Sequence, residues 1–115
     1  MTEAEFQKQV IALAHGLGLA VFHSTDSRRD IGKGYPDLTI VSPGGVLFAE
    51  LKTEFGRLSS EQTRWRYKLL AAGQQYRVWT PEDMEYGNIR AALENLTDPR
   101  IPADYDDTFR HPFTD

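Results

Sequence analysis

Residues 37–52 read DLTIVSPGGVLFAELK, and this stretch decides the predicted fold. Two segments with the pattern of strands, at 37–41 and 46–52, are joined by the sequence Ser-Pro-Gly-Gly. These turn residues, whose glycines tolerate positive φ angles, predict a β-hairpin. Side chains alternate between the two faces of a strand, so Glu50 and Lys52 are expected on one face. The opposite face should carry Leu47, Ala49 and Leu51.

A helix and a short strand are predicted before the hairpin. Thr2 and Glu5 have the spacing of a helix-capping box, and apolar residues follow at helical intervals. The apolar run at 19–23 is predicted as a strand. The segment 24–35 is polar, charged and rich in glycine, so we expect it to form a surface loop.

Two helices and a strand are predicted after the hairpin. Ser59 and Gln62 repeat the capping-box spacing before an amphipathic helix that ends at Gly73. The run at 76–79 is predicted as a fourth strand. Thr80-Pro81 then opens a last helix, because proline at the first helical position sacrifices no hydrogen bond. The indole side chains of Trp65 and Trp79 are expected in the core.

The chain has the length of a single domain. Its 115 residues suffice for one hydrophobic core but not for two. We predict an α/β domain over residues 1–96, with the order α-β-β-β-α-β, a trailing helix, and a mixed central sheet flanked by helices. Residues 97–115 lack periodicity and contain five aspartates against two arginines, which predicts an acidic, irregular tail.

Composition excludes several classes of protein. No apolar run approaches the roughly 20 residues that cross a bilayer, so no membrane association is expected. The sequence contains no cysteine, which excludes disulfides and thiolate metal sites. The first ten residues lack the pattern of a secretory signal. We therefore expect a cytoplasmic protein.

The distribution of charge favours nucleic acid despite the net charge of −4. Much of the excess negative charge lies in the tail. Basic residues gather in two earlier stretches, which comprise Arg28, Arg29 and Lys33, and then Arg57, Arg64, Arg66 and Lys68. Local basic patches can bind a phosphate backbone even when the whole chain is acidic, so these seven residues are candidate nucleic-acid contacts.

The hairpin also predicts a cluster of functional side chains. Asp37 begins one strand, and the short turn can bring it close to Glu50 and Lys52 near the end of the other. Two carboxylates would then converge beside an amine in a wet cleft. Hard divalent cations such as Mg²⁺ prefer oxygen ligands and keep several waters, which leaves positions for phosphate oxygens. A neighbouring lysine can orient a water or offset charge that develops on a phosphate.

Three segments resemble a known nuclease family. They are GYPDL at 34–38, FAELK at 48–52 and GRLSSEQ at 56–62. They are similar to the VRR-NUC branch of the PD-(D/E)xK nuclease superfamily, and the similarity spans most of residues 3–79. It implies a restriction-endonuclease-like αβββαβ core, related to Holliday junction resolvases, and a metal-dependent phosphodiesterase activity.

The resemblance also implies roles for individual residues. Asp37 and Glu50 would bind Mg²⁺ or Mn²⁺, the carbonyl of Leu51 would add a ligand, and Lys52 would assist the attacking water. A glutamine on the first helix often joins the site in this family, and Gln7 matches it, with Glu3 one turn earlier on the same face. Gln62 matches the family's glutamine on the later helix.

Each candidate has a simpler interpretation. Asp37 could be a turn residue, and Glu50 with Lys52 could form a solvated ion pair. Gln7 and Glu3 could be ordinary polar residues on the outer face of a helix, and the basic residues a charged helix face. A lone histidine at a strand end, such as His23, is more often structural than a ligand.

We expect a metal-dependent DNA endonuclease, specific for branched DNA such as Holliday junctions and active as a homodimer. A two-fold dimer would suit the two coordinated cuts that a junction requires. One alternative is a catalytically inactive DNA-binding or structural subunit, which the intact Asp37, Glu50 and Lys52 disfavour. The other is a nuclease that acts on RNA, because metal-assisted hydrolysis needs no 2′-hydroxyl.

Overall fold

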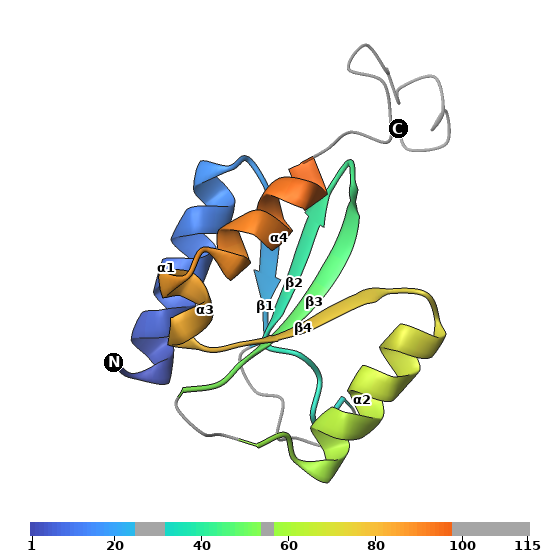
Figure 1. Cartoon of the computed structure of the whole chain (residues 1–115). Helices are drawn as coiled ribbons and strands as arrows, with labels where there is room; N and C mark the ends of the chain where they lie inside the picture. The colour runs from blue at the N-terminus through green and yellow to red at the C-terminus, as the bar shows by residue number, and fades with distance from the viewer. Residues whose placement is uncertain (25–31, 54–56, 98–115) are drawn as a thin grey trace, which may run out of the picture.

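The computed structural model describes residues 1–24, 32–53 and 57–97, and it confirms the predicted order of elements (Figure 1). The elements are α1 (Glu3–Gly16), β1 (Ala20–His23), β2 (Leu38–Ser42), β3 (Gly45–Leu51), α2 (Ser60–Ala71), β4 (Gln75–Trp79), α3 (Pro81–Glu85) and α4 (Asn88–Thr97). The strands form one sheet in the order β1-β2-β3-β4. β2 is antiparallel to both β1 and β3, whereas β4 is parallel to β3. The predicted α/β fold with a mixed central sheet is therefore confirmed.

Both predicted capping boxes are present. The Thr2 hydroxyl accepts a hydrogen bond from the backbone of Glu5, whose carboxylate accepts one from the backbone N–H of Thr2. Ser59 and Gln62 make the same reciprocal pair at the start of α2. Each box satisfies backbone donors that a helix start leaves free, so local sequence determines where both helices begin.

The predicted last helix is two helices. Gly87 adopts a positive φ of 80°, a conformation that L side chains rarely take, and it separates α3 from α4. The far end of α4 is tied to the β2–β3 turn, because the carbonyl oxygen of Leu96 accepts hydrogen bonds from Gly44 N and Ser42 Oγ. The break at Gly87 thus lets α4 lie along the sheet.

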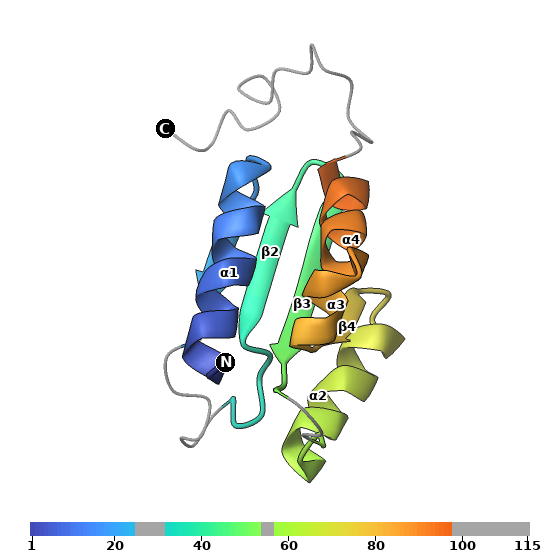
Figure 2. The same cartoon turned by 60° about the vertical axis from the view of Figure 1, so that its left-hand side comes forward.

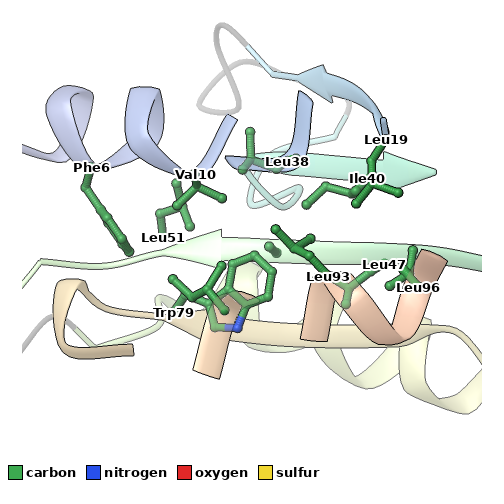
Figure 3. Close-up of a cluster of buried hydrophobic side chains, with 13 residues drawn as sticks. Phe6, Val10, Leu19, Leu38, Ile40, Leu47, Leu51, Trp79, Leu93 and Leu96 are labelled. Carbon is green, nitrogen blue, oxygen red and sulfur yellow. The ribbon is translucent and has the colours of Figure 1, made fainter. Parts of the chain in front are cut away.

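One face of the sheet carries the hydrophobic core beneath α1 and α4 (Figure 2). Figure 3 shows side chains from both helices packed against β2, β3 and Trp79. The largest fully buried apolar side chains are Phe6, Val10, Leu38, Ile40, Leu47, Leu51, Ile89, Leu93 and Leu96. Burying each such side chain stabilises the fold by about 1.5–3 kcal/mol. The buried Leu47, Ala49 and Leu51 confirm the predicted alternation along β3.

The opposite face of the sheet is covered only in part. It carries Phe22, Thr39, Phe48 and Tyr76, which lie in register across the four strands. α2 contacts β4 on this side and stands apart from α1 and α4 (Figure 1). Phe22 on the edge strand β1 is 65% exposed. Within the described ranges, no helix is long and apolar enough to span a membrane.

The prediction that both tryptophans lie in the core was wrong for one of them. Trp79 is 3% exposed and packs among the core side chains. Trp65 lies on α2, none of whose residues is buried, and its indole is only half-buried. The amphipathic pattern of α2 predicts that Trp65 lies on the packed side of the helix, but it does not indicate whether that side packs against the sheet or against a loop.

Candidate active site

Asp37 and Glu50 face each other at one end of the β2–β3 hairpin. Leu38 pairs with Ala49, and continuing this antiparallel register by one residue sets Asp37 opposite Glu50. Asp37 Oδ2 accepts a hydrogen bond of 2.9 Å from the backbone N–H of Leu51. Asp37 immediately precedes β2, and Lys52 immediately follows β3. The hairpin therefore brings the three predicted residues together.

The Glu50 carboxylate is buried, with an exposed fraction of 2%. Gln62 Nε2 donates a 2.9 Å hydrogen bond to Glu50 Oε2, and Lys52 Nζ lies 3.8 Å from the same oxygen. Glu50 Oε1 has no hydrogen-bond partner among the residues that the structure describes. The expectation that this carboxylate faces a wet cleft was wrong, because Glu50 is almost fully buried.

This environment disfavours the negative charge of Glu50. Its pKa is raised from 4.5 to about 8, chiefly by burial and then by the nearby Asp37 carboxylate. Protonation would relieve the repulsion and let Glu50 donate a hydrogen bond to Asp37. Lys52 opposes the increase in pKa, whereas Glu3 at the start of α1 adds to it. The site thus holds two neighbouring carboxylates, of which Glu50 has Lys52 as a positive partner.

These residues fit a hard divalent cation. A buried, unpartnered carboxylate oxygen beside a second carboxylate is costly alone, but it is a suitable ligand pair for an ion that prefers oxygen. The described residues contain no cluster of three or more Asp, Glu or His side chains that could enclose a metal ion. An ion that keeps several waters needs few protein ligands, so this donor set suits Mg²⁺ or Mn²⁺ better than a fully enclosed structural metal.

Gln62 connects the start of α2 to the carboxylates. Its Oε1 accepts a hydrogen bond from the backbone N–H of Ser59 within the capping box, while its Nε2 donates to Glu50. One amide therefore caps the helix and orients the buried carboxylate. Gln62 was predicted both as a capping residue and as the family's helix glutamine, but the sequence did not indicate that one side chain would do both.

The turn that precedes Asp37 holds α2 in place. Gly34 lies so close to α2 that a Cβ there would come within 2.6 Å of backbone and side-chain carbons of Glu61. Trp65 Nε1 donates a 3.0 Å hydrogen bond to the carbonyl oxygen of Lys33, and the Tyr35 ring meets the indole edge-on at 5.0 Å. Gly34, Tyr35 and Trp65 were not predicted to build the site, although two of them lie in the GYPDL segment.

The other predicted site residues lie at varying distances from this centre. Gln7 is half-buried on α1, and the hydrogen bonds that the described residues make do not join it to the carboxylates. Glu3 is exposed but close enough to influence Glu50. His23 is exposed at the end of β1, where it pairs with Leu38.

The predicted basic residues divide into groups. Arg28 and Arg29 lie outside the described residues. Lys33 and Arg57 line a cavity of about 320 Å³ that also contains Lys52, together with Gly34, Ser59, Glu61 and Gln62. Arg64 and Lys68 line a smaller cavity with Lys33. Arg66 is not among the residues that line either cavity. Its charge counteracts the burial that raises the pKa of Tyr76 on β4 to about 12.

Comparison with known proteins gives one structural match. A solved structure described as a "VRR_NUC domain" superposes with a TM-score of 0.61, covering 80% of this chain and 94% of that chain at 23% identity. This chain has the fold of a VRR-NUC domain. No protein-family model and no curated protein matches the sequence. The expected restriction-endonuclease-like core is consistent with this VRR-NUC fold.

Proposed function

We propose that the protein is a metal-dependent endonuclease that hydrolyses DNA phosphodiester bonds. The observation that carries this proposal is the buried Glu50 carboxylate. It lies beside Asp37, has the Lys52 amine 3.8 Å away, and has one oxygen without a hydrogen-bond partner in the described part of the chain. The VRR-NUC fold supports it, because the matched structure is named for a nuclease domain.

Each residue of the site has a proposed role. Asp37 and Glu50 hold Mg²⁺ or Mn²⁺, with the carbonyl of Leu51 as a further ligand, and the bound ion would supply Lewis-acid activation of water and phosphate. Lys52 orients the attacking water and offsets negative charge on the phosphate. Gln62 orients Glu50 through its 2.9 Å hydrogen bond. Gln7 and Glu3 complete the site from the side of α1.

The basic residues provide a path for the phosphate backbone. Lys33 and Arg57 share the larger cavity with Lys52, which places positive charge next to the site of chemistry. Arg28, Arg29, Arg64, Arg66 and Lys68 are proposed as further contacts. An acidic protein can bind DNA through such a local patch, and the affinity should fall steeply with salt.

The deciding experiment is cleavage by the purified full chain. We expect Mg²⁺ or Mn²⁺ to support nicking of supercoiled DNA, with no activity in EDTA. Lys52→Ala is the matched control, because it removes the amine and leaves both carboxylates. Cleavage by Lys52→Ala at the rate of the wild-type chain would contradict the proposal. Parallel assays on RNA of the same sequence test the alternative substrate, and binding without cleavage would indicate an inactive DNA-binding subunit.

We also propose a homodimer that prefers branched DNA such as a Holliday junction. One chain carries a single catalytic set, and a two-fold dimer would present two sets to the symmetric strands of a junction. The exposed Phe22 and Val41 lie on β1, the edge strand of the described sheet, and on its neighbour β2. They support self-association, because exposed apolar groups favour an interface. Light scattering tests the assembly, and competition between a junction and a linear duplex of equal length tests the preference. A monomer that binds the junction and the duplex equally well would refute the dimer and the junction preference, and would leave the nuclease proposal intact.

A further inference from the structure

A small cavity beside α2 is separate from the catalytic carboxylates. It has a volume of about 200 Å³ and is lined by Lys33, Glu61, Arg64, Trp65 and Lys68. Its wall therefore combines an aromatic ring with three cations and one carboxylate. The cavity is smaller than the roughly 300–1,000 Å³ of typical sites for drug-sized ligands, so it suits only a small group.

The indole that lines this cavity has a fixed orientation. Trp65 Nε1 is hydrogen-bonded to the carbonyl oxygen of Lys33, and Tyr35 packs edge-on against the ring at an interplanar angle of 83°. These contacts satisfy the N–H of Trp65 and fix its ring against that of Tyr35. The part of the ring that borders the cavity is thus held in place without being covered by the core.

The small cavity adjoins the catalytic one. Lys33 and Glu61 line both, and the larger cavity also contains Lys52 and Gln62. Glu61 is partly neutralised by its surroundings, because Arg64 Nη2 lies 3.9 Å from its carboxylate. Positive charge consequently continues from Lys52 along α2 to the ring of Trp65.

We propose that this cavity binds one unpaired nucleotide of the DNA substrate, with the base against Trp65 and its phosphate beside Arg64 and Lys68. The proposal rests on the proposed function, since the bound strand is the one that continues to Lys52. An aromatic surface next to cations is the combination that binds single-stranded nucleic acid, because every base has a π-face and every nucleotide a phosphate. Paired bases within a duplex are stacked and cannot enter.

The test measures binding by the full chain in EDTA, without catalysis. The probe is a short single-stranded oligodeoxythymidylate, compared with an abasic oligonucleotide of equal length and charge. We expect the base-bearing strand to bind about 5- to 150-fold more tightly, the range that one stacking contact supplies. It should also quench tryptophan fluorescence, and Trp65→Phe should remove that response because Trp79 is buried.

Two variants distinguish the cavity from general electrostatic attraction. Arg64→Ala combined with Lys68→Ala should weaken binding of the thymidylate strand by about tenfold or more. Arg90→Ala is the control, since Arg90 is an exposed helical arginine on α4 whose partner is Glu94. Equal affinity for the abasic and base-bearing strands, or unchanged binding by the double variant, would overturn the inference. Cleavage of supercoiled DNA is measured in a separate assay. A failure of the nuclease proposal can therefore be distinguished from a failure of the proposed nucleotide site.

Discussion

α1 and α2 begin with the same local signal, yet different forces hold them in place. Each has a complete capping box. α1 buries Phe6, Val10 and Ala14 against the sheet, whereas α2 buries no residue. The contacts described above for α2 are hydrogen bonds from Trp65 to Lys33 and from Gln62 to Glu50, together with the close approach of Gly34 to Glu61. The comparison indicates that α1 serves the core and α2 serves the active site.

The largest expected difference between the two helices concerns stability. Phe6→Ala in α1 should lower the free energy of unfolding by about 3–5 kcal/mol, because it opens a cavity in the core. Tyr67→Ala in α2 removes an aromatic side chain that is 75% exposed and should change it by less than about 0.5 kcal/mol. Urea denaturation of both variants measures this difference. A comparable loss for Tyr67→Ala would mean that α2 packs more extensively than its exposure indicates.

The next largest effect concerns the rate of cleavage at the active site beside α2. Lys52→Ala should lower kcat by about 10²–10³, the range for removing one group that stabilises charge in a transition state. The core under α1 is untouched, so the melting temperature should remain close to that of the wild-type chain. Single-turnover cleavage with saturating metal is the measurement. A variant that melts much earlier would show that Lys52 also supports the fold.

Glu50→Gln should reveal the cost of the buried carboxylate. The pKa of Glu50 is about 8 in the folded chain against 4.5 unfolded, so the folded state binds more protons between these values. The free energy of unfolding should therefore fall as pH rises through this window. At pH 8 in EDTA, Glu50→Gln should raise Tm by about 5 °C or more. In a separate assay with Mg²⁺, the same variant should abolish cleavage.

A titration with metal completes this comparison. Mg²⁺ should raise the Tm of the wild-type chain, because it binds the deprotonated carboxylate, and should leave that of Glu50→Gln nearly unchanged. Equal stability of both proteins in EDTA across pH 5–9 would mean that Glu50 is better solvated than its burial indicates.

The smallest expected effect tests how the turn before β2 positions α2. Gly34→Ala should displace α2 from Glu50 and lower kcat roughly tenfold, because a misplaced site loses activity even when it folds. Gly73→Ala is the matched control, since Gly73 has a similar φ of +82° but a Cβ at that position would have no neighbour within 4 Å. Both variants bear the same backbone strain. Equal losses of kcat would assign the effect to strain alone.

Much of the fold was predictable because its signals are local. Capping boxes mark the starts of α1 and α2, and alternation along 46–52 separates the core side chains from the site. Asp37, Glu50 and Lys52 were predictable as a group because the short turn leaves few ways to pair the strands. The break at Gly87 was harder to predict, since a helix often tolerates one glycine.

The sequence by itself determined the hairpin, the helix starts and the convergence of the three catalytic candidates, because each depends on residues close together along the chain. Only the tertiary structure decided how α2 lies. That position connects Gln62 to the buried Glu50 carboxylate and places Trp65 at a cavity instead of in the core. The physical reason is that α2 rests on contacts with residues 33–35 and 50, whose separation along the chain leaves no periodic pattern.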